Sequence, residues 1–367
     1  MLNNPTMTPL KQTPLYRDHV ELGAKMVDFG GWDLPVQYEG ILAEYAATRQ
    51  SVTVFDVSHM GEFIIEGDAL TSGLDRIVTM PIVDMPLKTC RYGMILNETG
   101  GVIDDLIVFR VERDNWFIVV NAATAEKDAA HFQKHLTAAA KFTDVSAQTG
   151  KLDLQGPRSR EILKKFVSGA EKLDYYSFGF FDLLRENVLI SRTGYTGELG
   201  YEIFFPWDKT PDLWRALLQS GDVKPAGLGA RDILRLEMGY SLYGHELSEA
   251  INPLEAGLTK FVHFDKSFIG KDALLALKSS GMTRRIVGIV SEDKRSPRAG
   301  QKLFSGEPEA GVVTSGSFSP HCQRGIGLGF VPAALSVGEK IFFGDAGRKF
   351  PAQIASRFFY KTGSIKS

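Results

Sequence analysis

The chain has 367 residues and a mass of 40.5 kDa, more than one ordinary hydrophobic core accommodates, so its length predicts two or three domains. With 44% hydrophobic and 23% charged residues and a mean hydropathy of −0.08, its composition excludes a disordered chain. The net charge is −2, the sequence pI of 6.4 argues against nucleic-acid binding, and the lack of any run of 18 apolar residues excludes a membrane-spanning helix.

Helices and antiparallel strands mix irregularly over the first 280 residues. Runs rich in β-branched and aromatic residues are expected as strands over residues 61–67, 91–96, 102–111, 115–121, 187–193 and 200–206. Capping signals, Ala-rich composition and apolar periods of 3.6 predict helices over residues 67–79, 121–140, 157–167 and 208–220. Because strands and helices do not alternate regularly, the order predicts an α+β fold of antiparallel sheets with packed helices.

The first of these helices, over residues 67–79, carries a specific expectation. Asp68 is its expected N-cap, and Leu70, Leu74 and Ile77 are expected to form its buried face.

The sequence changes character at residues 279–281, Ser-Ser-Gly. Beyond this point, short strands broken by Gly and Pro are expected over residues 284–290, 300–304, 309–319, 325–331, 339–344 and 350–358. Six short strands in fewer than 90 residues predict a small closed or nearly closed β-barrel. We therefore expect one division of the chain, between residues 1–280 and a barrel domain over residues 281–367.

The C-terminal part is basic although the chain as a whole is slightly acidic. Residues 282–367 contain 13 Lys and Arg against 6 Asp and Glu, a net charge of +7. Such a piece can guide an anionic ligand or an acidic protein partner. Since the basic residues are scattered along the segment, an ordinary solvated barrel surface is the favoured explanation.

The sequence gives little support to nucleotide, redox, metal or thiol chemistry. It contains no GxxxxGK[ST] phosphate loop, and the glycines of residues 325–330 have the wrong spacing for a flavin or nicotinamide site. His131 and His135 lie four residues apart but lack a third metal ligand nearby in the sequence. Cys322 adjoins His321, an arrangement that rarely forms a nucleophile–base pair. We expect no metal, no flavin and no nicotinamide.

The cysteines and the N-terminus bear on location. Cys90 and Cys322 are too few for a disulfide framework or a four-thiolate zinc site. Residues 1–20 lack the apolar segment of a secretory signal and the Arg and Ser bias of a transit peptide. We expect a reducing, cytoplasmic location without membrane attachment.

Two aspartates interrupt an otherwise apolar strand. Asp104 and Asp105 follow a turn at Gly100-Gly101, and because adjacent strand residues face opposite sides, one of them must point toward apolar neighbours. A buried carboxylate without a partner is costly, so a cation or donor is expected opposite it. An Asp pair that binds the turn itself is an equally weighted structural explanation.

Glu202 and Arg231 are further charged residues in apolar surroundings. Glu202 shares a strand with Phe204, after a glycine-rich loop that contains Tyr195, and its carboxylate suits a planar heterocycle with two adjacent N–H donors. The structural alternative is a sheet-edge pair with a surface Lys or Arg.

Arg231 lies near the start of an apolar-faced helix, where the helix dipole does not favour a cation, so a specific anionic partner is expected. The structural alternative is an ion pair with Asp232 or Glu237.

At these residues the sequence resembles the T-protein of the glycine cleavage system, an aminomethyltransferase family. The resemblance extends over most of the chain. It rests on motifs at residues 15–38, 55–63, 97–108, 119–124, 192–203, 226–247, 252–258, 268–274 and 314–320.

The resemblance implies a three-lobed α+β fold, with a folate-binding body of two lobes over residues 1–280 and the C-terminal barrel. It also implies the reaction, in which the aminomethyl group carried on the lipoyl arm of the H-protein passes to tetrahydrofolate. The products are 5,10-methylenetetrahydrofolate, ammonia and the reduced lipoyl arm. The expected partners are therefore the lipoylated H-protein and the other glycine cleavage proteins.

The motif positions imply seven site residues: catalytic Asp105, and cofactor-binding Met60, Tyr92, Asn121, Tyr195, Glu202 and Arg231. A fixed carboxylate suits this chemistry, because breaking the aminomethyl carbon–sulfur or carbon–nitrogen bond builds iminium-like positive charge. Asp105 is also placed by the resemblance to orient or deprotonate the attacking folate amine.

Three alternative functions compete with this one. One is a folate-binding relative that assists iron–sulfur enzymes, but residues 266–274 lack the cysteine that this group carries. Another is the folate-receiving part of an oxidative demethylase, which needs an upstream flavin domain. The third is a binding module without chemistry.

Overall fold

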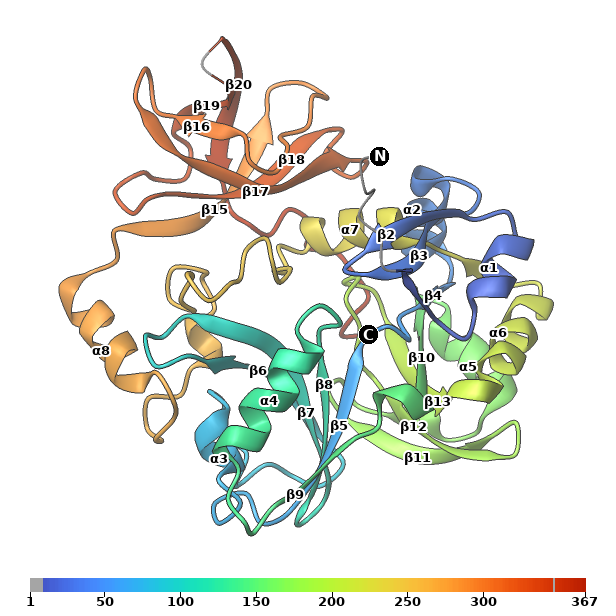
Figure 1. The fold of residues 1–367 in the computed structure, drawn as a ribbon. Helices are drawn as coiled ribbons and strands as arrows, with labels where there is room; N and C mark the ends of the chain where they lie inside the picture. Colours follow the sequence, from blue (N-terminus) through green and yellow to red (C-terminus); the bar gives the residue numbers. More distant parts are fainter. Residues whose placement is uncertain (1–8, 346) are drawn as a thin grey trace, which may run out of the picture.

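A computed structural model describes residues 9–345 and 347–367 (Figure 1). The described chain forms one lobe on a six-stranded sheet, a second lobe on a five-stranded sheet, and a closed six-stranded barrel. The α+β class and the C-terminal barrel expected from the sequence are confirmed.

The first lobe has the strand order β11-β12-β13-β10-β4-β14. Its strands are β4 (Thr53–Asp56), β10 (Thr149–Gln155), β11 (Phe178–Leu183), β12 (Glu186–Ser191), β13 (Gly200–Pro206) and β14 (Lys224–Pro225). A small sheet accompanies it, with strands β1 (Lys11–Gln12), β2 (Lys25–Phe29) and β3 (Trp32–Gln37). The helices of this part are α1 (Tyr16–Glu21), α2 (Ile41–Gln50), α5 (Ser159–Phe166), α6 (Thr210–Gln219) and α7 (Leu228–Glu237).

The second lobe has the strand order β6-β7-β8-β5-β9. Its strands are β5 (Gly61–Glu66), β6 (Cys90–Leu96), β7 (Val102–Glu112), β8 (Asn115–Val120) and β9 (Lys141–Asp144). The remaining α-helices are α3 (Leu74–Ile77), α4 (Ala125–His135) and α8 (Lys271–Ser280), and α8 leads toward the barrel in Figure 1. Short 3₁₀ turns lie at Ser146–Gln148, Ala170–Lys172, Trp207–Lys209 and Thr259–Phe261.

The barrel closes in the order β15-β18-β17-β16-β19-β20. Its strands are β15 (Arg284–Ser291), β16 (Lys302–Phe304), β17 (Glu309–Ser319), β18 (Arg324–Pro332), β19 (Lys340–Asp345) and β20 (Arg348–Ala355). Closure leaves no free sheet edge, and side chains such as Ile289, Leu303 and Phe343 fill the interior.

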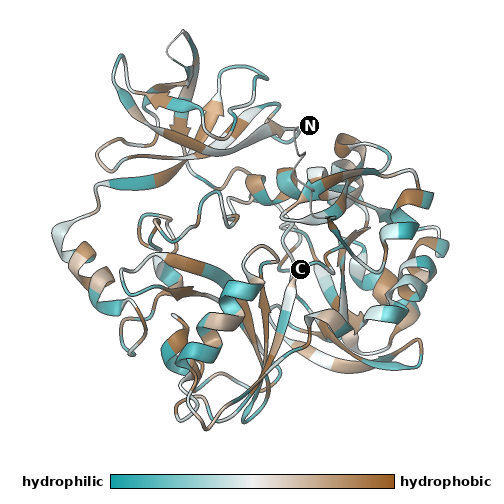
Figure 2. Ribbon diagram, in the orientation of Figure 1, coloured by the Kyte–Doolittle hydropathy of each residue, from teal (hydrophilic) through white to brown (hydrophobic). Residues whose placement is uncertain are grey.

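Apolar burial explains why these elements form. Figure 2 shows hydrophobic colour along strands of the sheets and hydrophilic colour on turns of helix α4. Large buried side chains anchor the two lobes separately: Trp214 of α6 belongs to the core of the six-stranded lobe, and Trp116 of β8 to that of the five-stranded lobe. Each sheet therefore has its own core, and polar residues buried between or beside the cores need a separate explanation.

The helix expected over residues 67–79 is wrong for most of its length. Only Leu74–Ile77 is helical, because Gly73 has a φ of +82°, which interrupts a right-handed helix. Asp68 instead accepts hydrogen bonds from the backbone of Leu70 and Thr71, both at 3.0 Å, in a turn. Leu70 is 63% exposed rather than buried.

The Ala-rich segment also forms a shorter helix than expected. Residues 121–124 form a turn before α4 begins at Ala125, and the helix ends at His135 because Leu136 is extended. That turn places Asn121 at the end of β8, in contact with both strand aspartates. Helices α1, α2 and α8 were not expected from the sequence.

Candidate functional site

Asn121 links the two aspartates of strand β7. Its side-chain amide donates to Asp104 Oδ1 and to Asp105 Oδ1, each at 2.9 Å, and its backbone N–H donates to Asp104 Oδ2 at 2.9 Å. The Tyr92 hydroxyl on β6 donates to Asp105 Oδ2 at 2.9 Å. The partners of both carboxylates are therefore neutral donors rather than a cation.

The strand register explains this meeting. Asp105 pairs with Met94 across β6 and β7, so Tyr92, two residues from Met94, emerges on the same face as Asp105. The turn at Gly100-Gly101 is instead held by Asn97, whose Oδ1 accepts from Gly101 N–H at 2.9 Å. The alternative in which the aspartates bind that turn is therefore wrong.

Burial and a second carboxylate change the acidity of Asp105. Desolvation and the neighbouring Asp104 charge raise the pKa of Asp105 to about 7, while the hydrogen bonds from Tyr92 and Asn121 oppose this rise. A carboxyl group with a pKa near neutrality can both accept a proton and stabilise positive charge under ordinary conditions. Asp105 is thus chemically suited to either role.

A second charged cluster lies on the six-stranded sheet. Lys151 Nζ on β10 is 2.7 Å from Glu202 Oε1 on β13, and both side chains are almost fully buried. The Thr193 hydroxyl donates to Glu202 Oε2. Met60 Sδ lies 3.4 Å from Lys151 Nζ. Although burial opposes it, the ion pair with Lys151 holds the pKa of Glu202 below its usual value.

Arg231 contacts the same face of this sheet. Asp153 pairs directly with Glu202 in the β10–β13 register, and Lys151 lies two residues away, so all three side chains share one face. Arg231, in the first turn of α7, donates to Asp153 Oδ2 at 2.7 Å. Burial and the nearby Glu202 charge raise the pKa of Asp153 to about 6.

The structural alternatives, a sheet-edge ion pair for Glu202 and an ion pair with Asp232 or Glu237 for Arg231, are both wrong. Glu202 pairs with a buried lysine on a central strand, not with a surface cation at a sheet edge. Arg231 pairs with Asp153, whereas Asp232 pairs with Arg235 at 2.9 Å.

Tyr195 lies between the two clusters. The Arg231 guanidinium lies 5.1 Å from the centre of its ring, and the Tyr240 ring stacks on it at 5.6 Å between centroids. Its hydroxyl donates to the Ser241 carbonyl. Burial raises the pKa of Tyr195, with Arg235 and, less strongly, Arg231 opposing the rise and Asp105 adding to it. Tyr195 is thus within electrostatic reach of Asp105 on the five-stranded sheet and of Arg231 on helix α7.

The seven predicted residues therefore form two groups joined by one tyrosine. Asp105, Tyr92 and Asn121 are directly hydrogen bonded, Met60 and Glu202 meet at Lys151, and Arg231 contacts Tyr195. The sequence prediction missed Lys151 and Asp153. The sequence carried no comparable signal, because Lys151 and Asp153 alternate with Leu152 and Leu154 as on an ordinary strand with one polar face, whereas Asp104 and Asp105 are adjacent charges in an apolar run.

Two further buried groups adjoin the second cluster. The His59 Nδ1 atom and both Glu62 carboxyl oxygens have no hydrogen-bond partner among residues 9–345 and 347–367. Burial lowers the pKa of His59 to about 4, and burial raises that of Glu62. Burial therefore favours the neutral form of both side chains.

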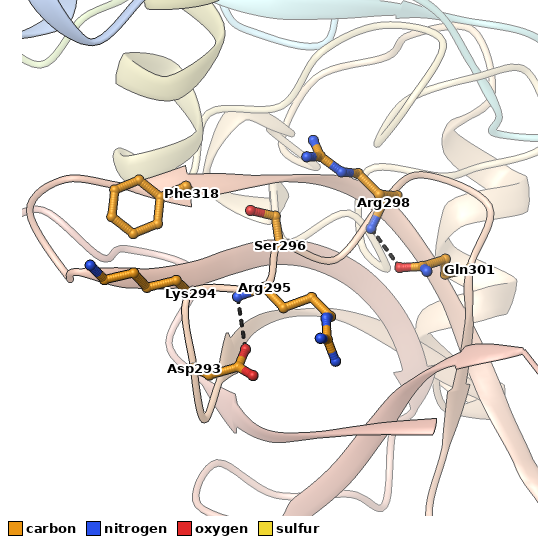
Figure 3. Close-up of a pocket in the computed structure, with 7 residues that line it drawn as sticks. All are labelled: Asp293, Lys294, Arg295, Ser296, Arg298, Gln301 and Phe318. Atoms are coloured by element: carbon orange, nitrogen blue, oxygen red, sulfur yellow. Dashed lines mark hydrogen bonds between the residues drawn. The ribbon is translucent and has the colours of Figure 1, made fainter. Parts of the chain in front are cut away.

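A hollow on the barrel surface contains none of the predicted residues (Figure 3). Figure 3 shows the basic side chains Lys294, Arg295 and Arg298 and the ring of Phe318 among its lining residues. It is open to solvent and includes part of the basic C-terminal segment.

Residues 9–345 and 347–367 contain neither a metal-binding cluster nor a membrane-spanning helix. No three His, Cys, Asp or Glu side chains there are placed to hold a metal ion. No helix in these ranges is long and apolar enough to cross a membrane.

Comparisons with known proteins agree over most of the chain. The GCVT N-terminal domain model matches residues 15–266, and the glycine cleavage T-protein C-terminal barrel domain model matches residues 284–361. An aminomethyltransferase of Pseudothermotoga lettingae is 43% identical over 365 residues, covering 98% of this chain and 100% of that protein. An aminomethyltransferase of Listeria monocytogenes (serotype 4b) is 41% identical, covering 97% and 99%.

A solved structure is also similar. The glycine cleavage system aminomethyltransferase T from Bartonella henselae superposes with a TM-score of 0.91 at 33% identity, covering 97% of this chain and 99% of that chain.

Proposed function

The chain belongs to the glycine cleavage T-protein family, and from this we propose that it transfers a one-carbon unit from an aminomethyl-loaded lipoyl arm to tetrahydrofolate. The products are 5,10-methylenetetrahydrofolate, ammonia and the reduced lipoyl arm. The observation that carries the proposal at the level of chemistry is the half-buried Asp105, held by Tyr92 and Asn121.

Asp105 takes the catalytic role in this proposal. Cleavage of the aminomethyl group builds positive charge on the transferred carbon, and a carboxylate fixed by two hydrogen bonds stabilises that charge without reorganising. With its pKa raised to about 7 by burial and by Asp104, Asp105 also accepts a proton from the attacking folate amine. Tyr92 and Asn121 orient the carboxylate for both tasks.

The Glu202 cluster takes the role of binding the pterin. An ionised carboxylate accepts up to about four hydrogen bonds, so the contacts with Lys151 and Thr193 leave capacity for pterin N–H donors. Lys151 keeps Glu202 ionised, and Arg231, held by Asp153, adds positive charge for the acidic part of a folate. Tyr195 and Met60 supply apolar contact surface.

The partner proposed for this reaction is the lipoylated H-protein, together with the other glycine cleavage proteins. We also propose a cytoplasmic location, which the two unbonded cysteines, Cys90 and Cys322, support.

One assay tests the function. Purified chain is mixed with aminomethyl-loaded H-protein, and ammonia release is followed with and without tetrahydrofolate. A folate-dependent release supports the proposal. Folate binding measured by calorimetry without any ammonia release would instead indicate a binding protein of the same fold.

A further inference from the structure

A third carboxyl group, that of Asp128, is buried next to Asp104, one of the two strand aspartates. It lies in the first turn of α4, where its backbone N–H donates to the Thr124 carbonyl at 2.8 Å, and its side chain is fully buried. Its carboxyl group is within hydrogen-bonding reach of the Asp104 carboxyl. The mechanism proposed above assigns Asp128 no role.

The hydrogen-bond donors around the Asp104–Asp128 pair are unequally distributed. Asp104 accepts two hydrogen bonds from Asn121. Neither oxygen of Asp128 accepts a hydrogen bond from the residues that the structure describes, and the nearby Thr124 hydroxyl donates to the Asn121 carbonyl at 3.0 Å. The stabilised anion of the pair is therefore Asp104.

Two carboxylates in contact in a buried site cannot both be ionised, so the pair retains a proton. Since Asp104 has the donors, the proton belongs on Asp128, which then points its own O–H at Asp104. Burial and the Asp104 charge raise the pKa of Asp128 accordingly.

We propose that Asp128 is a positioning residue that remains a protonated acid, donates a hydrogen bond to Asp104, and thereby fixes Asn121 and Asp105. The inference rests on the proposed function in one respect only, namely that Asp105 is the group whose placement matters for turnover. The hydrogen-bonded series runs from α4 through β7 to the end of β8 and back to the Asp105 carboxylate on β7.

Other charged and titratable groups surround this series without replacing Asp128. Lys127 on α4 donates to the Tyr243 hydroxyl at 2.8 Å and to Glu249 at 2.9 Å, so its charge is shared with a separate acid. On the other side, Tyr92 contacts Asp105, and Tyr195 is within its electrostatic reach.

Two substitutions separate hydrogen bonding from mere space filling. Asp128→Asn retains an N–H that donates to Asp104, whereas Asp128→Ala removes the donor. Loss of one buried donor corresponds to about tenfold in rate, so we expect Asp128→Ala to lower kcat about tenfold or more with little change in KM. Asp128→Asn should retain kcat within about twofold of the original chain. Glu126→Gln, on the exposed face of the same helix, is the matched control and should change nothing.

The pH dependence of kcat distinguishes a positioning role of Asp128 from a purely structural one. Without its donor, Asp104 retains a proton more readily, so its repulsion of Asp105 falls and the pKa of Asp105 falls with it. The acid limb of the kcat profile should therefore move to lower pH in Asp128→Ala and stay in place in Asp128→Asn. Equal impairment of both variants with unmoved limbs would overturn the positioning role.

Infrared spectroscopy tests the protonated state without any turnover. At pH 8 the carboxylic-acid C=O stretching absorption of the original chain should contain a component that is lost in Asp128→Asn and retained in Glu126→Gln, while absorption from other buried acids is common to all three spectra. Identical spectra for the original chain and Asp128→Asn would refute the proposal. Because the band does not depend on glycine cleavage activity, it persists if the proposed function fails and disappears only if this inference fails.

Discussion

Asp105 combines three features in one half-buried strand residue: a desolvated carboxyl group, two neutral donors and a neighbouring carboxyl group. Replacing it by Asn preserves its shape but removes the charge and the proton-accepting oxygen. We expect Asp105→Asn to lower kcat by about a hundredfold or more, while the folate Kd and the melting temperature change little. Kinetics with near-normal kcat in this variant would remove Asp105 from its role.

The same carboxyl group sets the pH dependence. Because its pKa is raised to about 7, Asp105 is protonated in most molecules below that pH and cannot stabilise positive charge. We expect kcat to fall about tenfold per pH unit below about pH 7, with a slope of one proton. A profile that is flat between pH 6 and pH 8 would contradict an ionised Asp105 in the reaction.

Glu202 is expected to act on binding rather than on the chemical step. Glu202→Gln keeps hydrogen-bonding capacity but removes the charge that pairs with Lys151, and its amide presents a donor to the pterin N–H groups. We expect the folate Kd to rise about tenfold or more, with kcat at saturating folate reduced far less. Calorimetry gives Kd directly, and the double variant Lys151→Met/Glu202→Gln controls for the uncompensated lysine.

At this scale the sequence revealed which residues are unusual but not what they contact. Asp105, Glu202 and Arg231 stand out as charges in apolar surroundings from the sequence alone. Their partners are distant in sequence: Lys151 is 51 residues from Glu202 and meets it only through the β10–β13 register. Such pairing depends on tertiary topology, which local patterns do not determine.

At the scale of elements, helix α7 connects the candidate site to the barrel. Arg231 in its first turn contacts Asp153 of the six-stranded sheet. Arg235, one turn later, is buried and donates to Glu246 at 2.9 Å and to Ser315 of barrel strand β17 at 2.8 Å. The spacing of four residues thus places two cations of one helix along the path from site to barrel.

Arg235→Met tests this connection. The substitution fills similar volume but leaves Glu246 as an unpaired buried charge, which costs about 3–5 kcal/mol of stability. We expect a clear loss of unfolding free energy in denaturant titrations. The double variant Arg235→Met/Glu246→Gln should recover part of it, and a single variant as stable as the original chain would show that the pair contributes nothing.

Element boundaries were the least predictable part of the fold. The strands were largely correct because β-branched and aromatic runs are local signals, and β13 was predicted with its observed bounds. The two helices that shortened, α3 and α4, did so for reasons of backbone conformation and tertiary contact. Gly73 interrupts the first, and Asn121 is held outside the second by its bonds to Asp104 and Asp105.

At the scale of the molecule, we propose the division of the chain at residue 280. Helix α8 ends at Ser280 and the first barrel strand begins at Arg284, and the barrel has its own buried core. The sequence predicted the barrel because each of its strands carries a local signal. It did not predict how Asp105 of the five-stranded lobe and Arg231 of helix α7 come within electrostatic reach of Tyr195.

The buried acids connect the site to the stability of the whole molecule. Burial raises the pKa of Asp153 to about 6, of Asp105 to about 7 and of Asp128 to about 10, above the value of 3.8 expected in the unfolded chain. An acid whose pKa is raised by folding binds its proton more tightly in the folded protein. The stability that this proton contributes is therefore fully present below the unfolded-state pKa and is lost as pH rises toward the folded-state pKa.

Comparing the original chain with Asp128→Asn isolates one such proton. Between about pH 5 and pH 9, Asp128 is protonated when folded and ionised when unfolded, whereas the amide never titrates. The unfolding free energy of the original chain relative to the variant should therefore fall by about 1.4 kcal/mol per pH unit across that range. Denaturant titrations at several pH values measure this slope. A pH-independent difference would mean that Asp128 ionises normally in the folded protein and that the lobe tolerates three adjacent carboxylates.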